Sequence, residues 1–119
     1  MRDDHQRLLD IREGIERIEK YTTGGRAEFD ESEIVQTWVL HHLQIISEAA
    51  RALSADCKFR QPDIPWEKIN GMRNILVHHY FGIDTEILWA VVEKELPQLK
   101  TSIAQMIERE KPQNGVQPI

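Results

Sequence analysis

Apolar residues recur at steps of three and four along most of this chain, which is the spacing of one face of an α-helix. Such stripes cover residues 3–21, 30–53 and 65–81, and a fourth begins near residue 85 and extends past residue 106. Paired glycines and a proline-rich stretch separate the first three stripes. None of these stretches has the period of two that marks a β-strand. The pattern therefore predicts an all-α protein, an antiparallel bundle of four to five helices.

Local signals predict where the second and fourth helices begin and where the fourth bends. Asp30 followed by Glu33 resembles a capping box that opens the second helix. Asp84 or Thr85 is expected to cap the fourth helix. Pro97 lies inside the fourth stripe and removes one backbone donor, so it predicts a kink there.

The size of the chain suits one domain, expected at residues 1–110, with residues 111–119 as a frayed tail because they contain two prolines and a glycine. No apolar run approaches the roughly 20 residues that span a bilayer, and the N-terminus lacks the pattern of a signal peptide. We therefore expect a cytoplasmic protein without a membrane partner. The single cysteine, Cys57, excludes an internal disulfide and is expected in a loop, in an unreactive role.

The charge of the chain argues against a general nucleic-acid binder. The formal net charge is −5 and the pI is near 5.5. Proteins that bind nucleic acid through the phosphate backbone are usually basic, because neutralising phosphates releases counterions and supplies most of the affinity. A local basic patch, or a basic surface contributed by a partner, remains compatible with this composition.

A polar cluster in the third predicted helix is the main candidate site. Residues 73–80 contain Arg73, Asn74, His78 and Tyr80, which a core does not require. Arginine presents a fork of donors to phosphate oxygens, and histidine exchanges protons near neutral pH. Asparagine can stabilise an oxyanion, and the tyrosine hydroxyl can hold a ligand or accept a group. The set suits metal-free chemistry at a phosphate; the structural alternative is partly buried bundle residues, with Arg73 paired to a glutamate.

Helix geometry limits how this cluster can work. Arg73 and His78 are five positions apart, about 140° around a regular helix, so their α-carbons do not share a face. They can converge through the long arginine stem, through a loosened turn near Val77, or across a symmetric dimer. Gly71 costs about 0.8–1 kcal/mol relative to alanine within a helix. A close approach of two helices near Gly71 and Asn74 would explain this glycine; otherwise it is merely tolerated.

The string IPWEKINGMRNILVHHYFGID, residues 64–84, resembles the signature of the HepT-like toxins, a branch of the HEPN (higher eukaryotes and prokaryotes nucleotide-binding) superfamily. The resemblance includes the R-x-x-x-x-H-x-Y motif at Arg73, His78 and Tyr80, with Asn74 directly after the arginine. It implies a HEPN-like helical homodimer in which the two motif helices meet near the two-fold axis. It also implies a metal-independent endoribonuclease that acts on RNA without a cofactor, with Arg73, Asn74 and His78 as its catalytic residues.

The same resemblance implies a partner, a minimal nucleotidyltransferase that acts as the antitoxin. This enzyme is expected to neutralise the toxin by transferring AMP to Tyr80, and the dimer can assemble with it into a larger hetero-oligomer. The alternative function is a non-catalytic HEPN scaffold or the substrate-binding subunit of a nucleotidyltransferase. The acidic charge favours this alternative, because it gives RNA little long-range attraction. The intact motif favours the nuclease.

The remaining histidines do not predict a metal site. His41 and His42 are adjacent, as are His78 and His79, whereas two imidazoles on one helix grip a metal from positions i and i+4. We expect His42 to be a hydrogen-bonded interface histidine and His79 to have a helper or surface role. The three tryptophans are expected to be core residues or dimer anchors.

Overall fold

A computed structural model describes residues 3–77 and 84–110 of the chain, and for residues 72–77 it describes the course of the helix only. All regular elements within this part of the chain are helical, which confirms the all-α prediction. They are α1 (Asp4–Tyr21), α2 (Gly25–Glu31), α3 (Glu33–Ala52), α4 (Ala55–Phe59), α5 (Trp66–Val77), α6 (Thr85–Ala90), the π-helical turn η1 (Val91–Glu95) and α7 (Leu96–Arg109).

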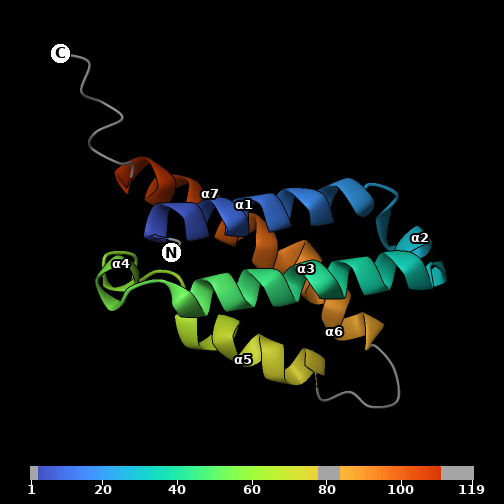
Figure 1. Ribbon diagram of the computed structural model, residues 1–119. Coiled ribbons are helices and arrows are strands. Elements are labelled where there is room, and N and C mark those ends of the chain that lie inside the picture. Colours follow the sequence, from blue (N-terminus) through green and yellow to red (C-terminus); the bar gives the residue numbers. More distant parts are fainter. Residues whose placement is uncertain (1–2, 78–83, 111–119) are drawn as a thin grey trace.

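The helices form an antiparallel bundle with α1 and α3 at its centre (Figure 1). Helix α7 packs against α1, and α5 packs against the other side of α3. Gly14 lets α1 and α3 approach closely, since a Cβ added there would lie 2.8 Å from Cγ1 of Ile46. The short helices α2 and α4 lie at opposite ends of the bundle.

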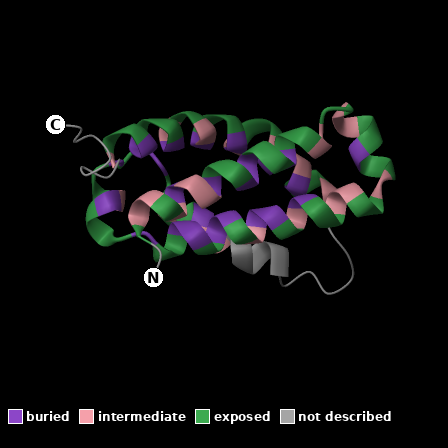
Figure 2. Ribbon diagram, turned by 45° about the horizontal axis from the view of Figure 1, so that its top comes forward, coloured by how far each residue is buried: buried purple, intermediate pink, exposed green. Residues whose placement is uncertain are grey.

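The core consists of the apolar stripes that the sequence predicts on the first, second and fourth helices, and the buried residues face inward in Figure 2. From α1, α3 and α7 it includes Leu8, Ile11, Ile15, Ile18, Val39, Leu43, Ile46, Ala50, Leu96, Leu99, Ile103 and Met106. Burial of these side chains, at roughly 25 cal/mol per Å² of apolar surface, is the main force that holds the helices together. No helix in the described residues is long and apolar enough to cross a membrane.

The predicted capping box at Asp30 is wrong, because Asp30 lies inside α2 and accepts hydrogen bonds from Arg26. The residue that caps α3 is Ser32, whose extended backbone allows its hydroxyl oxygen to accept from the backbone N–H of Val35. The chain between α1 and α3 therefore consists of a turn at residues 22–24, the short helix α2 and the cap residue Ser32.

The stretch between α3 and α5, which we expected to be a loop, contains the short helix α4. Ser54 begins it by accepting a hydrogen bond from the N–H of Cys57, and the side chain of Asp4 holds both the N–H and the hydroxyl of Ser54. Cys57 is consequently buried in a helix, with no exposed surface. A five-residue helix that needs a carboxylate 50 positions away cannot be predicted from local periodicity.

The irregularity predicted at Pro97 takes the form of the π turn η1, which ends immediately before α7. A proline has no N–H to donate and its ring clashes with the carbonyl four residues earlier, so the preceding turn widens. This turn also changes which residues face the core. Leu88 and Val91 are buried, whereas the next residues along the chain, Trp89 and Val92, are only partly buried. The predicted cap Asp84 is confirmed, since its side chain accepts from the N–H of Ile87.

Candidate functional site

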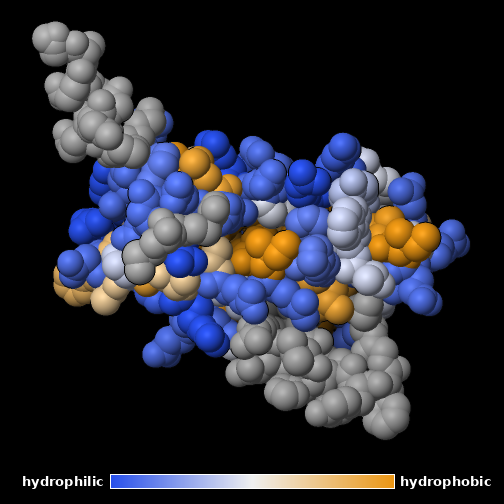
Figure 3. Space-filling model, in the orientation of Figure 1, coloured by the Kyte–Doolittle hydropathy of each residue, from blue (hydrophilic) through white to orange (hydrophobic). Residues whose placement is uncertain are grey.

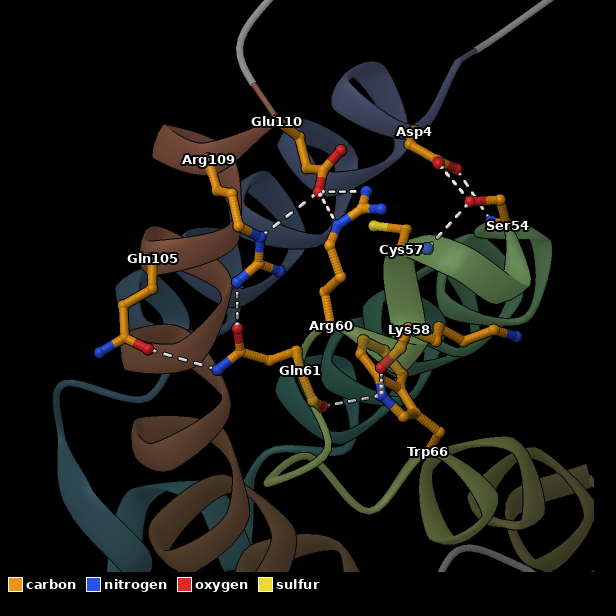
Figure 4. Close-up of polar contacts among 10 residues, drawn as sticks. All are labelled: Asp4, Ser54, Cys57, Lys58, Arg60, Gln61, Trp66, Gln105, Arg109 and Glu110. Atoms are coloured by element: carbon orange, nitrogen blue, oxygen red, sulfur yellow. Dashed lines mark hydrogen bonds and ion pairs between the residues drawn. The ribbon is translucent and has the colours of Figure 1, made fainter.

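The start of α5, the helix that carries the candidate site, is fixed by backbone and side-chain hydrogen bonds. The N–H of Ile69 donates to the carbonyl of Pro65, which begins the helix. The indole N–H of Trp66 donates to the carbonyls of Lys58 and Gln61, both at 3.1 Å (Figure 4). These contacts tie the first turn of α5 to the end of α4.

Two neighbouring elements hold α5 further along. The hydroxyl of Ser47 on α3 donates to the carbonyl of Ile69 at 3.1 Å, in a buried position. On the opposite side, Lys68 forms an ion pair of 3.1 Å with Glu95 at the end of η1. One hydrogen bond to α3 and one ion pair to η1 therefore hold α5 about one turn before Arg73, the predicted catalytic arginine.

Arg73 and Asn74 both lie on α5, which confirms only that they are helical. Arg73 comes four residues after the buried Ile69 and seven after Trp66, which packs against the core. Its α-carbon therefore lies on the same side of the helix as those of Trp66 and Ile69. The α-carbon of Asn74 is turned about 100° from it. His78, His79 and Tyr80 lie outside the described residues. The convergence of Arg73 with His78 therefore stays a prediction.

Gly71 has open space beside it. A Cβ placed there would meet no atom of the described residues within 4 Å, so no helix in this part of the chain packs closely against the position. Of the two explanations for this glycine, close packing would require a second molecule. The open position leaves room for the backbone of such a molecule.

Asn70 is a residue that the sequence did not single out. Its Oδ1 atom is buried and has no hydrogen-bond partner among the described residues. Buried acceptors are rarely left unpaired, and those that are often belong to sites that bind a water or ligand. The signal available in the sequence was a polar residue one helical turn before Asn74.

The histidine pair on α3 is accounted for by protein contacts. His42 is buried and its Nδ1 atom lies 2.8 Å from the carbonyl oxygen of Trp38, as expected for a hydrogen-bonded histidine. His41 is exposed, and its ring stacks on that of Trp38 with 5.6 Å between centroids. In the described residues, no three His, Cys, Asp or Glu side chains are placed to hold a metal ion.

Three arginines, after α4, at the end of α7 and in α2, already bind carboxylates. Arg60 and Arg109 both donate to Glu110, and the closest contact is 2.6 Å (Figure 4). The hydrogen bond to Glu110 raises the pKa of Arg60 further above its ordinary value. At the other end, Arg26 donates to Glu86 at 2.6 Å. These guanidinium groups stabilise the fold and are not available as a ready phosphate site.

Hydrophilic side chains cover most of the face in Figure 3, where separate apolar patches lie along α3. Exposed apolar residues of this helix include Ile34, at 81% relative exposure, and Ile45.

Cys57 is expected to be unreactive in the folded protein. Burial raises the pKa of its thiol to about 11, and only the thiolate reacts with disulfide reagents. At pH 8 we expect labelling by such a reagent to be about 100-fold slower in the native protein than in urea, where the thiol regains its ordinary pKa. Equal labelling rates in the two states would contradict the buried position.

A sequence model of a protein family, described as "Ribonuclease HepT-like", matches residues 11–106 of this chain. The match extends from α1 into α7 and includes the whole polar cluster of residues 73–80. No solved structure matches the chain significantly.

Curated proteins from archaea are similar over most of the chain. "Probable ribonuclease HepT" of Thermococcus cleftensis is 39% identical over 102 residues, 84% of this chain and 93% of that protein. "Putative RNase MJ1380" of Methanocaldococcus jannaschii is 35% identical over 103 residues, 86% of this chain and 94% of that protein. A longer protein of the same organism, "Gamma-glutamylcyclotransferase and putative RNase MJ0434", is 37% identical over 91% of this chain. The match covers half of the length of that protein.

Proposed function

Because this chain belongs to the HepT-like ribonuclease family, we propose that it is a metal-independent endoribonuclease and the toxin of a toxin–antitoxin pair. The observation that carries the proposal is the family match across residues 11–106, within which this chain keeps the complete R-x-x-x-x-H-x-Y motif. The names of the two relatives matched over nearly their whole length point to the same activity.

The proposed reaction needs only protons and charge stabilisation. The 2′-hydroxyl of the RNA attacks the adjacent phosphorus and the bond to the 5′-oxygen breaks, which leaves a 2′,3′-cyclic phosphate and a 5′-hydroxyl. His78 takes the proton of the 2′-hydroxyl or returns one to the 5′-oxygen. Arg73 and Asn74 stabilise the charge that develops on the phosphate oxygens.

A homodimer would complete this site. In a regular helix the 140° between Arg73 and His78 keeps them apart, so a composite site with both residues from two chains solves the geometry. The open position at Gly71 supports this arrangement, because the described residues leave space beside this glycine for a second motif helix. Two copies of His78 would then supply the base and the acid.

The test is incubation of the purified protein with RNA in excess EDTA. We expect cleavage that leaves 2′,3′-cyclic phosphate ends, because no step uses a metal ion. Loss of cleavage in EDTA, with recovery on addition of Mg²⁺, would contradict the proposed chemistry.

Tyr80 is proposed as the acceptor of AMP from a minimal nucleotidyltransferase antitoxin. An attached AMP adds a negative phosphate and a nucleoside within two helical turns of Arg73, where it can occupy the guanidinium and repel RNA. After incubation with the partner enzyme and ATP, we expect mass spectrometry to find AMP on Tyr80 and RNA cleavage to fall.

Tyr80→Phe should carry no AMP and should continue to cleave RNA in the presence of the partner. Tyr21→Phe is the matched control, since Tyr21 lies on α1, and it should be modified and inhibited like the parent protein. Modification of Tyr80→Phe to the same extent as the parent would remove Tyr80 as the acceptor.

The net charge of −5 favours the second candidate function, a non-catalytic scaffold or substrate-binding subunit of a nucleotidyltransferase. A protein of this kind would bind the partner enzyme and leave RNA intact in the same assay. The two functions therefore differ in one measurement, the appearance of cyclic phosphate ends.

A further inference from the structure

A cavity of about 180 Å³ lies between the start of α5 and the long helix formed by α6, η1 and α7. Its walls are mainly apolar and include Ile69 of α5, Ile87 of α6 and Leu99 of α7. Polar and charged side chains, among them Asp63 and Lys68, also line it. None of these residues belongs to the predicted catalytic set.

The π turn η1 forms part of the cavity wall, through Val91 and Glu95. A π turn is wider than an α-helical turn, and such turns within longer helices occur frequently at functional sites. Here the turn lies opposite the first half of α5, and the ion pair between Lys68 and Glu95 joins the two elements. The side chains of α5 and α7 consequently leave space between them.

The charged groups of the cavity are more acidic than basic. They comprise the carboxylates of Asp63 and Glu95 and the ammonium group of Lys68, which is paired with Glu95. Asp63 is held by neutral donors, since it accepts from Ser102 at 2.9 Å and from Gln61 at 2.6 Å. Its carboxylate is exposed to solvent and oriented by these two hydrogen bonds, and neither donor carries a charge that would compensate it.

We propose that this cavity binds a small molecule made of an apolar ring and a short positively charged arm. A cavity of about 150 Å³ lined by Leu, Ile and Phe is known to stay dry and to bind benzene, so the volume and apolar walls here suit one small ring. The arm would reach the carboxylate of Asp63. Arylalkylamines have this chemistry, and tryptamine is a suitable probe.

The binding test compares three probes that share an indole ring, namely tryptamine, indole and indole-3-acetate. We expect tryptamine to bind about two- to fivefold more tightly than indole in calorimetry at low salt, and indole-3-acetate to bind most weakly. Asp63→Asn should remove the preference for tryptamine while indole binding is kept. Equal affinities for the three probes, or an unchanged preference in Asp63→Asn, would overturn the role of the charge.

A cavity-filling variant tests the location. Gln98 lines the cavity from an exposed position on α7, so Gln98→Trp should lower the affinity for tryptamine by about tenfold or more. Ala104→Trp is the matched control, because Ala104 is exposed on the same helix and does not line the cavity. Absence of tryptamine binding to the parent protein, or equal loss in both variants, would overturn the proposal. None of these readouts depends on RNA cleavage, so the result is independent of the proposed nuclease function.

Discussion

His78→Ala is expected to lower RNA cleavage by about 10²–10⁴-fold, the range that general acid–base catalysis contributes. If two copies of His78 serve one composite site, the substitution removes both proton-transfer groups and the loss should lie at the upper end. The measurement is the initial rate at which cyclic phosphate ends appear, at saturating RNA. His41→Ala is the control, because His41 is an exposed histidine on α3 and should leave the rate within about twofold.

Arg73→Ala should have an effect of similar size, since loss of one donor to a developing oxyanion costs about 2.7–4 kcal/mol. Arg73→Lys should recover little activity, because an ammonium group lacks the planar fork that binds two phosphate oxygens. Arg12→Ala removes an exposed arginine from α1 and serves as the matched control. Cleavage at the parental rate by Arg73→Ala or His78→Ala would exclude the proposed chemistry.

Mixing two inactive variants tests whether one site takes its residues from both chains of a dimer. A mixture of the Arg73→Ala and His78→Ala proteins forms heterodimers in which the shared cleft still contains one arginine and one histidine, so one proton-transfer group remains and part of the activity should return. Recovery of activity on mixing, above that of either variant alone, is the result expected of a shared site. Additive, near-zero activity in a mixture whose subunits have exchanged would contradict sharing.

Ile46→Ala is expected to destabilise the fold by about 2–5 kcal/mol, a large share of the roughly 5–15 kcal/mol that holds a small domain together. Ile46 is completely buried on α3, and it contacts α1 at the point where Gly14 allows the two helices to approach. The substitution leaves a cavity at the most extensive helix contact of the bundle. Urea unfolding followed by circular dichroism measures the change.

Ile34→Ala is the control for Ile46→Ala, since it removes the same atoms from the same helix. Ile34 is 81% exposed, so its loss should change the free energy of unfolding by no more than about 0.5 kcal/mol. A cost as large as that of Ile46→Ala would mean that the exposed face of α3 is covered in solution. Equal, small costs at both positions would contradict the packing of α1 against α3.

Periodicity predicted the bundle and most of its core because three long helices bury a single stripe each. The stripes of α1, α3 and α7 are buried as expected, and Pro97 marked the irregular turn. Periodicity failed where structure depends on contacts between distant residues. Helix α4 needs Asp4 to hold Ser54, and the burial of Cys57 follows from that contact.

The sequence predicted which residues form the candidate site, but only part of how they are placed relative to one another. The spacing of Arg73 and Asn74 placed them on one helix, and the structure agrees. The positions of His78 and Tyr80 relative to them depend on residues beyond the described part of α5. The cavity between α5 and α7 could not be predicted from the sequence, because its walls come from segments on either side of the motif, at 63–69 and 87–102.

The π turn allows this helix to lose one residue without moving the buried residues that follow it. The buried residues Val91 and Leu96 are five positions apart, and a regular helix would turn the second about 140° away from the first. Since both face the core, the wider turn absorbs one surplus residue. Loss of a single residue between them would restore ordinary helical pairing and keep every later core position in phase. In a relative whose helix is one residue shorter, the missing residue is therefore expected between these two positions.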